Sequence, residues 1–130
     1  MAGLNDAVNA SLYEKLSFDF IRDIAPVATV IQQPLVMVVH PSVPAKTVPE
    51  FIAYAKANPG KINTASAGKG STLHLAGELF KMMPGVDLTH VPYRGGGPAR
   101  TDLIGGQAQV RFPTPPSSMA YARPGGLRAW

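Results

Sequence analysis

The sequence predicts an α/β domain with a mostly parallel sheet flanked by helices. Segments rich in β-branched residues alternate with segments whose apolar residues recur at helical spacing. Two of the joints from strand to helix are rich in glycine, at residues 67–71 and 94–98. Residues 35–39 are almost entirely apolar, which is typical of a strand covered on both faces.

The composition limits the classes of function. The chain has 130 residues, 45% hydrophobic and 15% charged, which suits one folded domain and argues against disorder. The net charge of +4 is spread along the chain, so it indicates a mild preference for anions and no nucleic-acid surface. No cysteine is present, which excludes disulfides and thiolate sites. The N-terminus lacks the pattern of a signal peptide, so the chain as written is expected to be cytoplasmic.

The elements of the first half follow from spacing and capping residues. Apolar residues in 5–16 predict a short amphipathic helix, and residues 24–31 and 35–39 are expected to be strands. Thr47 and Glu50 form a capping box, which predicts a helix from there to about Asn58.

The second half repeats one unit of strand, loop and helix. Strands are expected at 62–66, 88–93 and 108–112, helices at 73–83, 99–104 and 118–122, and the start of a further strand at Leu127. Because the chain stops at that point, we expect the hydrogen-bonding groups of this last strand to lack partners.

The two glycine-rich joints are the candidate binding site. We call residues 66–71 the first corner and residues 93–98 the second corner. Both follow strands of a parallel sheet, so they should lie side by side at one sheet edge, where free helix N–H groups favour an anion. For the first corner alone, an ordinary helix cap by Ser66 or Ser71 is an equally good interpretation.

The histidines and Arg94 have two interpretations each. His74 lies one turn into a helix and can face the ligand or the core, and the structural role is favoured. His40 and His90 are interpreted as structural. Arg94 can pair with a carboxylate, although loop arginines are more often solvated.

No catalytic or metal site is predicted. Gly70 separates Lys69 from Ser71, which breaks the phosphate-loop pattern, and the carboxylates and histidines do not cluster as metal ligands would. An enzymatic hypothesis would depend on Ser71 and His74, for which the sequence offers no third catalytic member.

Several stretches match one family in order and spacing. They include Val39-His40-Pro41-Ser42-Val43-Pro44-Ala45-Lys46-Thr47, Ala55-Lys56-Ala57-Asn58-Pro59-Gly60-Lys61, His74-Leu75-Ala76-Gly77-Glu78-Leu79-Phe80 and His90-Val91-Pro92-Tyr93-Arg94-Gly95-Gly96-Gly97-Pro98-Ala99. With these residues, nearly the whole chain resembles the solute-binding receptors of tripartite tricarboxylate transporters, also called the Bug family of extracytoplasmic solute receptors.

The resemblance implies a periplasmic receptor with two lobes, not an enzyme, that binds a small organic acid and passes it to membrane transporter subunits. It implies no cofactor, and the residues themselves predict no metal site, no nucleic-acid surface and no membrane-spanning segment. Carried over, the first grip consists of Ser66, Gly68, Gly70, Ser71 and His74, and the second of Tyr93, Gly95 and Gly96.

The resemblance also implies a type II periplasmic-binding-protein lobe that is truncated at both ends. Residues 1–33 would be a remnant of the first lobe with a crossover strand, 34–116 the ligand-gripping second lobe, and 117–130 an incomplete return to the first lobe. A truncated remnant with no independent activity is the alternative. Arg111 departs from the family, where an apolar strand residue is usual, and would cost several kcal/mol if buried without a partner.

Overall fold

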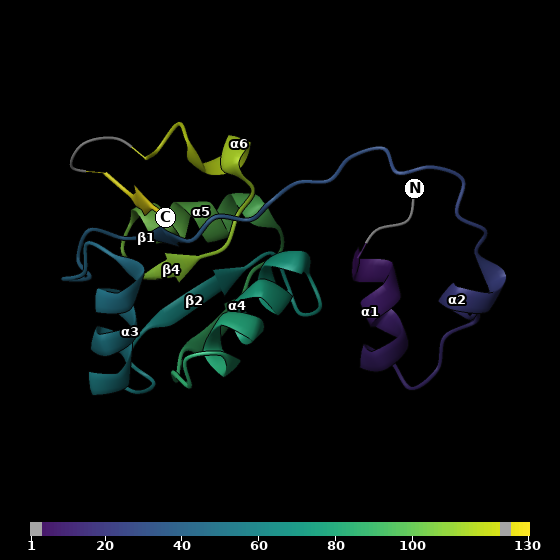
Figure 1. Cartoon of the computed structure of the whole chain (residues 1–130), viewed down its shortest axis with the longest axis horizontal. Coiled ribbons are helices and arrows are strands. Elements are labelled where there is room, and N and C mark those ends of the chain that lie inside the picture. Colours follow the sequence, from purple (N-terminus) through teal and green to yellow (C-terminus); the bar gives the residue numbers. More distant parts are fainter. Residues whose placement is uncertain (1–3, 123–125) are drawn as a thin grey trace.

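The computed structural model describes residues 4–122 and 126–130. A mixed sheet in the order β3-β2-β4-β1-β5 lies in the left part of Figure 1, and the N-terminal helices lie apart from it on the right. The strands are β1 (Val38–Val39), β2 (Asn63–Ser66), β3 (Thr89–Pro92), β4 (Val110–Arg111) and β5 (Arg128–Ala129). The helices are α1 (Leu4–Leu12), α2 (Phe20–Asp23), α3 (Val48–Ala57), α4 (Thr72–Met82), α5 (Gly96–Ile104) and α6 (Pro115–Ser118).

The sheet is parallel where the glycine-rich corners lie. β2 pairs in parallel with β3 on one side and with β4 on the other. β1 runs antiparallel to both β4 and β5. The predicted α/β class with a mostly parallel sheet is therefore confirmed, with β1 as the strand of opposite direction.

Helices cover both faces of the sheet. On one face, α3 and α4 pack over Val39 and Val110, and Phe51 and Phe112 fill the same cluster. On the other face, α5 packs through Leu103 against Val38. Two small-residue contacts, Ala99 of α5 with Ala65 of β2 and Ala108, bring α5 close to the strands. Each face thus has its own apolar contacts, which is why the central strands are buried on both sides.

Capping residues define the beginnings of two helices as predicted. The Thr47 hydroxyl accepts a hydrogen bond from the backbone N–H of Glu50, at 3.4 Å, and α3 ends at Ala57. The Glu50 carboxylate accepts from the N–H of Lys46 at 2.7 Å, one residue before the partner that a capping box would use. Ser71 caps α4 by accepting from the N–H of His74.

Two expectations about strands are wrong. Residues 24–31 form no strand: they run as an exposed extended connection, where the Val27 side chain is 97% exposed. Strand-forming composition is not enough there, because no described segment lies alongside to accept the hydrogen bonds of a ladder. The last strand, by contrast, has a partner, since β5 pairs with β1 and Trp130 exchanges backbone hydrogen bonds with Met37.

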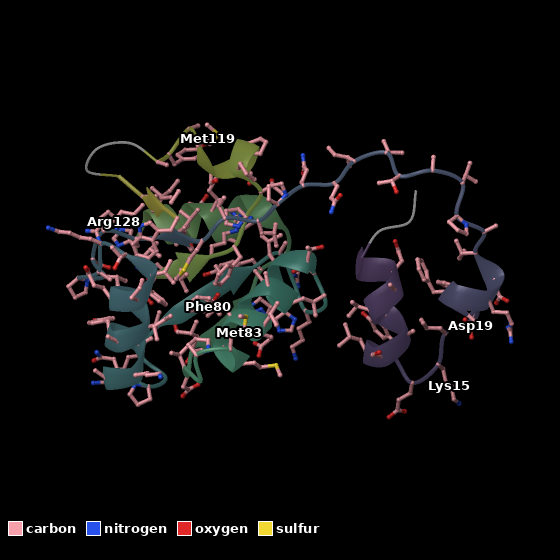
Figure 2. The ribbon with its side chains drawn as sticks, viewed as in Figure 1. Lys15, Asp19, Phe80, Met83, Met119 and Arg128 are labelled. Atoms are coloured by element: carbon pink, nitrogen blue, oxygen red, sulfur yellow. The ribbon has the colours of Figure 1, made fainter. Side chains whose placement is uncertain are left out.

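Arg128 fixes β5 to the loop before α3. Its guanidinium donates hydrogen bonds to the carbonyl oxygens of Pro41, Val43 and Ala45. Figure 2 shows Arg128 on the side of the molecule where this loop lies. The short β5 strand is therefore held by a side chain as well as by its ladder.

None of the helices in the described ranges has the length and apolar character needed to cross a membrane.

Candidate ligand-binding site

The first and second corners lie side by side at one edge of the sheet. The N–H of Tyr93 donates to the carbonyl of Ser66 at 3.1 Å, and the N–H of Gly95 donates to the carbonyl of Ala67 at 3.2 Å. A Cβ atom on Gly68 would lie 3.5 Å from the carbonyl oxygen of Tyr93. The predicted adjacency of the two corners is therefore confirmed.

The corners turn to opposite faces of the sheet. β2 leads through the first corner into α4, which packs on the face of Thr64, and Gly77 of α4 would place a Cβ 3.5 Å from the Thr64 hydroxyl. β3 leads through the second corner into α5, which packs on the face of Ala65. Neighbouring parallel strands whose connections diverge in this way leave a crevice at their carboxyl ends, where α/β proteins bind ligands.

The polar side chains of the first corner are already paired with one another. The Ser66 hydroxyl bonds to both the N–H and the carbonyl of Gly68, and lies 2.7 Å from Nε2 of His90. The Ser71 hydroxyl donates to the carbonyl of Gly68 at 2.7 Å while capping α4. These contacts match the capping interpretation of the first corner, so a ligand there would have to replace existing bonds.

His74 is also engaged within the protein. Its Nδ1 accepts the N–H of Gly70 at 3.1 Å, and its Nε2 lies 3.6 Å from the Glu78 carboxylate. Its ring stacks on the ring of His90, with centroids 3.9 Å apart. The His74 ring thus stabilises the backbone conformation of the first corner. Ser71 and His74 do not form a nucleophile and base pair, because the Ser71 hydroxyl donates to a carbonyl oxygen.

Gly70 is covered by the N-terminal part of the chain. Gly70 has a positive φ of 75°, and any Cβ there would collide with Cδ1 of Leu12, from the end of α1. The first corner is therefore partly closed by an apolar side chain in addition to its internal hydrogen bonds.

The second corner is more open to a ligand. Gly95 has a φ of 112°, in the region that favours glycine, and α5 begins after it without any side-chain cap. Cβ atoms on Gly95 or Gly97 would meet nothing within 4 Å. The first N–H groups of a helix have no intrahelical acceptor and carry partial positive charge, so this end of α5 is suited to an anion.

Tyr93 supports the second corner from the side. Its hydroxyl donates to the Asp102 carboxylate at 2.7 Å, and its ring packs beside Ala65 and Ala99. Burial and the Asp102 carboxylate raise the pKa of Tyr93 to about 12. The phenol therefore stays protonated at neutral pH and holds α5 to the end of β3.

All eight residues predicted for the site lie in or beside the two corners, but they differ in how far their polar groups already bond within the protein. Ser66, Ser71 and His74 bond within the first corner, while Gly95 and Gly96 form the uncapped start of α5. Arg94 follows β3 and is exposed. No cluster of metal-ligating side chains exists within residues 4–122 and 126–130.

The stacked histidines give a testable dependence of stability on pH. Burial lowers the pKa of His90, with contributions from His74, Lys81 and Lys69, while Glu78 acts in the opposite direction. The folded protein therefore binds fewer protons at His90 than the unfolded chain does, and stability falls as the pH drops below the ordinary histidine range. One such group changes the free energy of unfolding by at most about 1.4 kcal/mol per pH unit.

We expect the urea midpoint of the wild type to be lower at pH 5.5 than at pH 7.5. In His90→Gln the difference between the two midpoints should be smaller. The same substitution at His40, which contacts Ser42 instead of this cluster, serves as the control. An equal pH response in wild type and His90→Gln would contradict the assignment.

Comparison with known proteins agrees with this architecture. The family model for the tripartite tricarboxylate transporter family receptor matches residues 2–130. BugT of Bordetella pertussis is 36% identical over 123 residues, which cover 95% of this chain and 38% of BugT. A UPF0065 protein of Cupriavidus necator is 37% identical over 114 residues, covering 88% of this chain and 35% of that protein.

Solved structures show the same fold. A periplasmic transporter superposes with a TM-score of 0.82 at 42% identity, covering 97% of this chain and 41% of its own. MatC of Rhodopseudomonas palustris, solved with malate, gives a TM-score of 0.84 at 28% identity, covering 98% of this chain and 44% of its own. An R. palustris protein solved with adipate gives a TM-score of 0.80 at 33% identity, covering 90% of this chain and 39% of its own.

The sheet, its flanking helices and the paired corners define a lobe of the periplasmic-binding-protein type. The chain belongs to the tripartite tricarboxylate transporter receptor family, which includes the Bug proteins. This family is one of solute-binding receptors and not an enzyme family. The chain spans 38% of BugT and 35% of the C. necator relative.

Proposed function

We propose that this chain is the ligand-gripping part of an extracytoplasmic receptor that binds small organic acids at the two corners. The observation that carries the proposal is the open, uncapped N-terminus of α5 beside the first corner. An acid carboxylate would accept hydrogen bonds there and be stabilised by the helix dipole. The malate and adipate bound by two structural relatives support carboxylates as the ligand class.

The contacts of the two corners support unequal roles for the predicted residues. The N–H groups of Gly96 and Gly97 would contact the acid directly, whereas the N–H of Gly95 already donates to Ala67 and joins the two corners. Ser66, Ser71 and His74 would keep the first corner in shape, because their hydrogen bonds are made within it. The first corner would then form one wall of the binding crevice, and the second corner would bind the charged carboxylate of the acid.

The family membership supports the wider role. In the complete receptor, residues 34–116 would form the second lobe, and residues 1–33 and 117–130 would belong to or lead toward the first lobe. The receptor would act in the periplasm without catalysing a reaction, and would deliver its acid to membrane transporter subunits.

Thermal unfolding with malate, adipate and their uncharged diamides tests the proposal. A ligand at about 100 times its Kd adds roughly 2.7 kcal/mol to stability. We expect one or more acids to raise the Tm while the diamides at equal concentration and ionic strength do not. Equal effects of acids and diamides would contradict recognition of the carboxylate charge, and no effect of any acid on the folded chain would favour a remnant without binding activity.

A substitution at Gly97 makes the test specific to α5. Gly97 lies in the first turn, its φ is not positive, and a new side chain would meet nothing within 4 Å. Gly97→Asp should stabilise the ligand-free chain by about 0.3–1 kcal/mol through the helix dipole, yet reduce the response to acids by repelling them. Gly97→Asn, with nearly the same size and no charge, is the matched control and should keep more of the response.

A further inference from the structure

Arg111 is a charged residue in the middle of the sheet. Its side chain is 5% exposed, and its register partners Val38 and Ala65 are 0% and 1% exposed. Because Ala65 and Arg111 are paired across neighbouring strands, both side chains lie on the face of the sheet that α5 covers. Most of the Arg111 side chain, including Nε, is thus buried between the sheet and α5.

This buried cation lacks a counter-charge within the described residues. Nε of Arg111 is buried and has no hydrogen-bond partner, and none of the ion pairs in the described ranges includes Arg111. Burial, followed by repulsion from Arg100, lowers the pKa of Arg111. A buried charge without a partner is costly, and a bound anion would offset that cost.

The guanidinium is aimed at the second corner. A Cβ atom on Gly96, the first residue of α5, would lie 3.0 Å from Nη2 of Arg111. The positive end of the α5 dipole and a full positive charge therefore lie together, at an N-terminus that no side chain caps. Two adjacent positive groups destabilise each other unless an anion lies between or beside them.

We propose that Arg111 is the counter-charge for a carboxylate held at the N-terminus of α5, and that it makes the chain select acids over their amides. This inference rests on the proposed function and adds a residue and a basis for specificity to it. A guanidinium presents its N–H groups in a planar fork that matches the two oxygens of a carboxylate. An amide in the same place has one acceptor oxygen and brings two further donors to a site already rich in donors.

A purely structural role for Arg111 makes the opposite predictions. In that case the aliphatic stem fills space next to α5, and an unbranched apolar side chain such as Met would replace it with little effect on binding. In the proposed role, removing the charge relieves the unpaired cation in the ligand-free chain but removes the partner of the acid.

The experiment compares wild type with Arg111→Met, Arg111→Gln and Arg111→Lys. Titration calorimetry with malate, adipate and the monoamide of each gives Kd, and thermal unfolding without ligand gives Tm. We expect Arg111→Met to raise the Tm of the ligand-free chain and weaken acid binding about thirtyfold or more. The preference for acid over monoamide should shrink in Arg111→Met and Arg111→Gln, and partly return in Arg111→Lys.

The outcomes separate this inference from the proposed function. If wild type binds no acid, the proposed function fails and this inference fails with it. If wild type binds acids and Arg111→Met binds them equally well, only the role of Arg111 is overturned. If Arg111→Met does not fold, Arg111→Gln gives the same decision. The proposal would also be overturned if Arg111→Lys lost as much of the preference for acid over monoamide as Arg111→Gln.

Discussion

Phe51→Ala is expected to lower the free energy of unfolding by about 3–5 kcal/mol. Phe51 is fully buried in α3, and its ring meets Phe80 of α4 at a centroid distance of 5.9 Å and Trp130 at 6.4 Å, both edge to face. One side chain therefore joins two helices and the C-terminal end of the chain. Alanine would leave a cavity lined by rings that cannot easily collapse into it.

Urea unfolding followed by the fluorescence of Trp130 measures this loss. Domains of this size are commonly stable by only 5–15 kcal/mol, so the substitution removes a large share of the total. Phe18→Ala is the matched control, because Phe18 is 41% exposed and its loss should cost much less. Similar midpoints for Phe51→Ala and wild type would show that α3 does not depend on this contact.

The parts of the fold that the sequence predicts well are those decided by local chemistry. Thr47 and Ser71 are capping residues whose side chains accept the hydrogen bonds expected of them, so α3 and α4 begin where predicted. The adjacency of the two corners was also predictable, because consecutive parallel strands bring their carboxyl ends to one edge. Both inferences need only neighbours in the chain or one pairing rule.

The failures occur where a distant partner decides the outcome. Residues 24–31 have the composition of a strand but no described segment pairs with them, whereas β5 has only two residues and is held by β1 and by Arg128. Composition reports a preference for extended backbone, while a ladder requires a second segment at the right place. That place is set by the whole fold.

In the candidate site too, local features could be predicted from the sequence, whereas contacts with distant segments could not. The glycines of both corners were visible in the sequence, but their different engagement was not, since Leu12 approaches Gly70 from a remote helix. Arg111 was visible as a charge in an apolar strand. Its direction depended on the pairing of β4 with β2 and on which face α5 covers, and neither follows from spacing along the chain.

Leu103→Ala is expected to destabilise the chain by about 2–5 kcal/mol. Leu103 is 1% exposed and packs with Val38 and Leu127, so it anchors the C-terminal half of α5 to the sheet and to the segment before β5. The other contacts of α5 are the packing of Ala99 against Ala65, Ala108 and Tyr93, and one hydrogen bond from Tyr93 to Asp102, and they bury less apolar area. Little else compensates for the loss of Leu103 on this face.

The neighbouring residue gives a matched control, because Ile104 is 45% exposed on the same helix and Ile104→Ala should cost far less. Hydrogen exchange adds a second readout: α5 amides should exchange faster in Leu103→Ala, while α4, which packs on the opposite face, should change less. Equal losses in the two variants would mean that α5 is not anchored through Leu103. Because α5 carries the second corner, Leu103→Ala should also weaken the response to acids, even though Leu103 lies on the last turn of the helix, far from the corner that binds them.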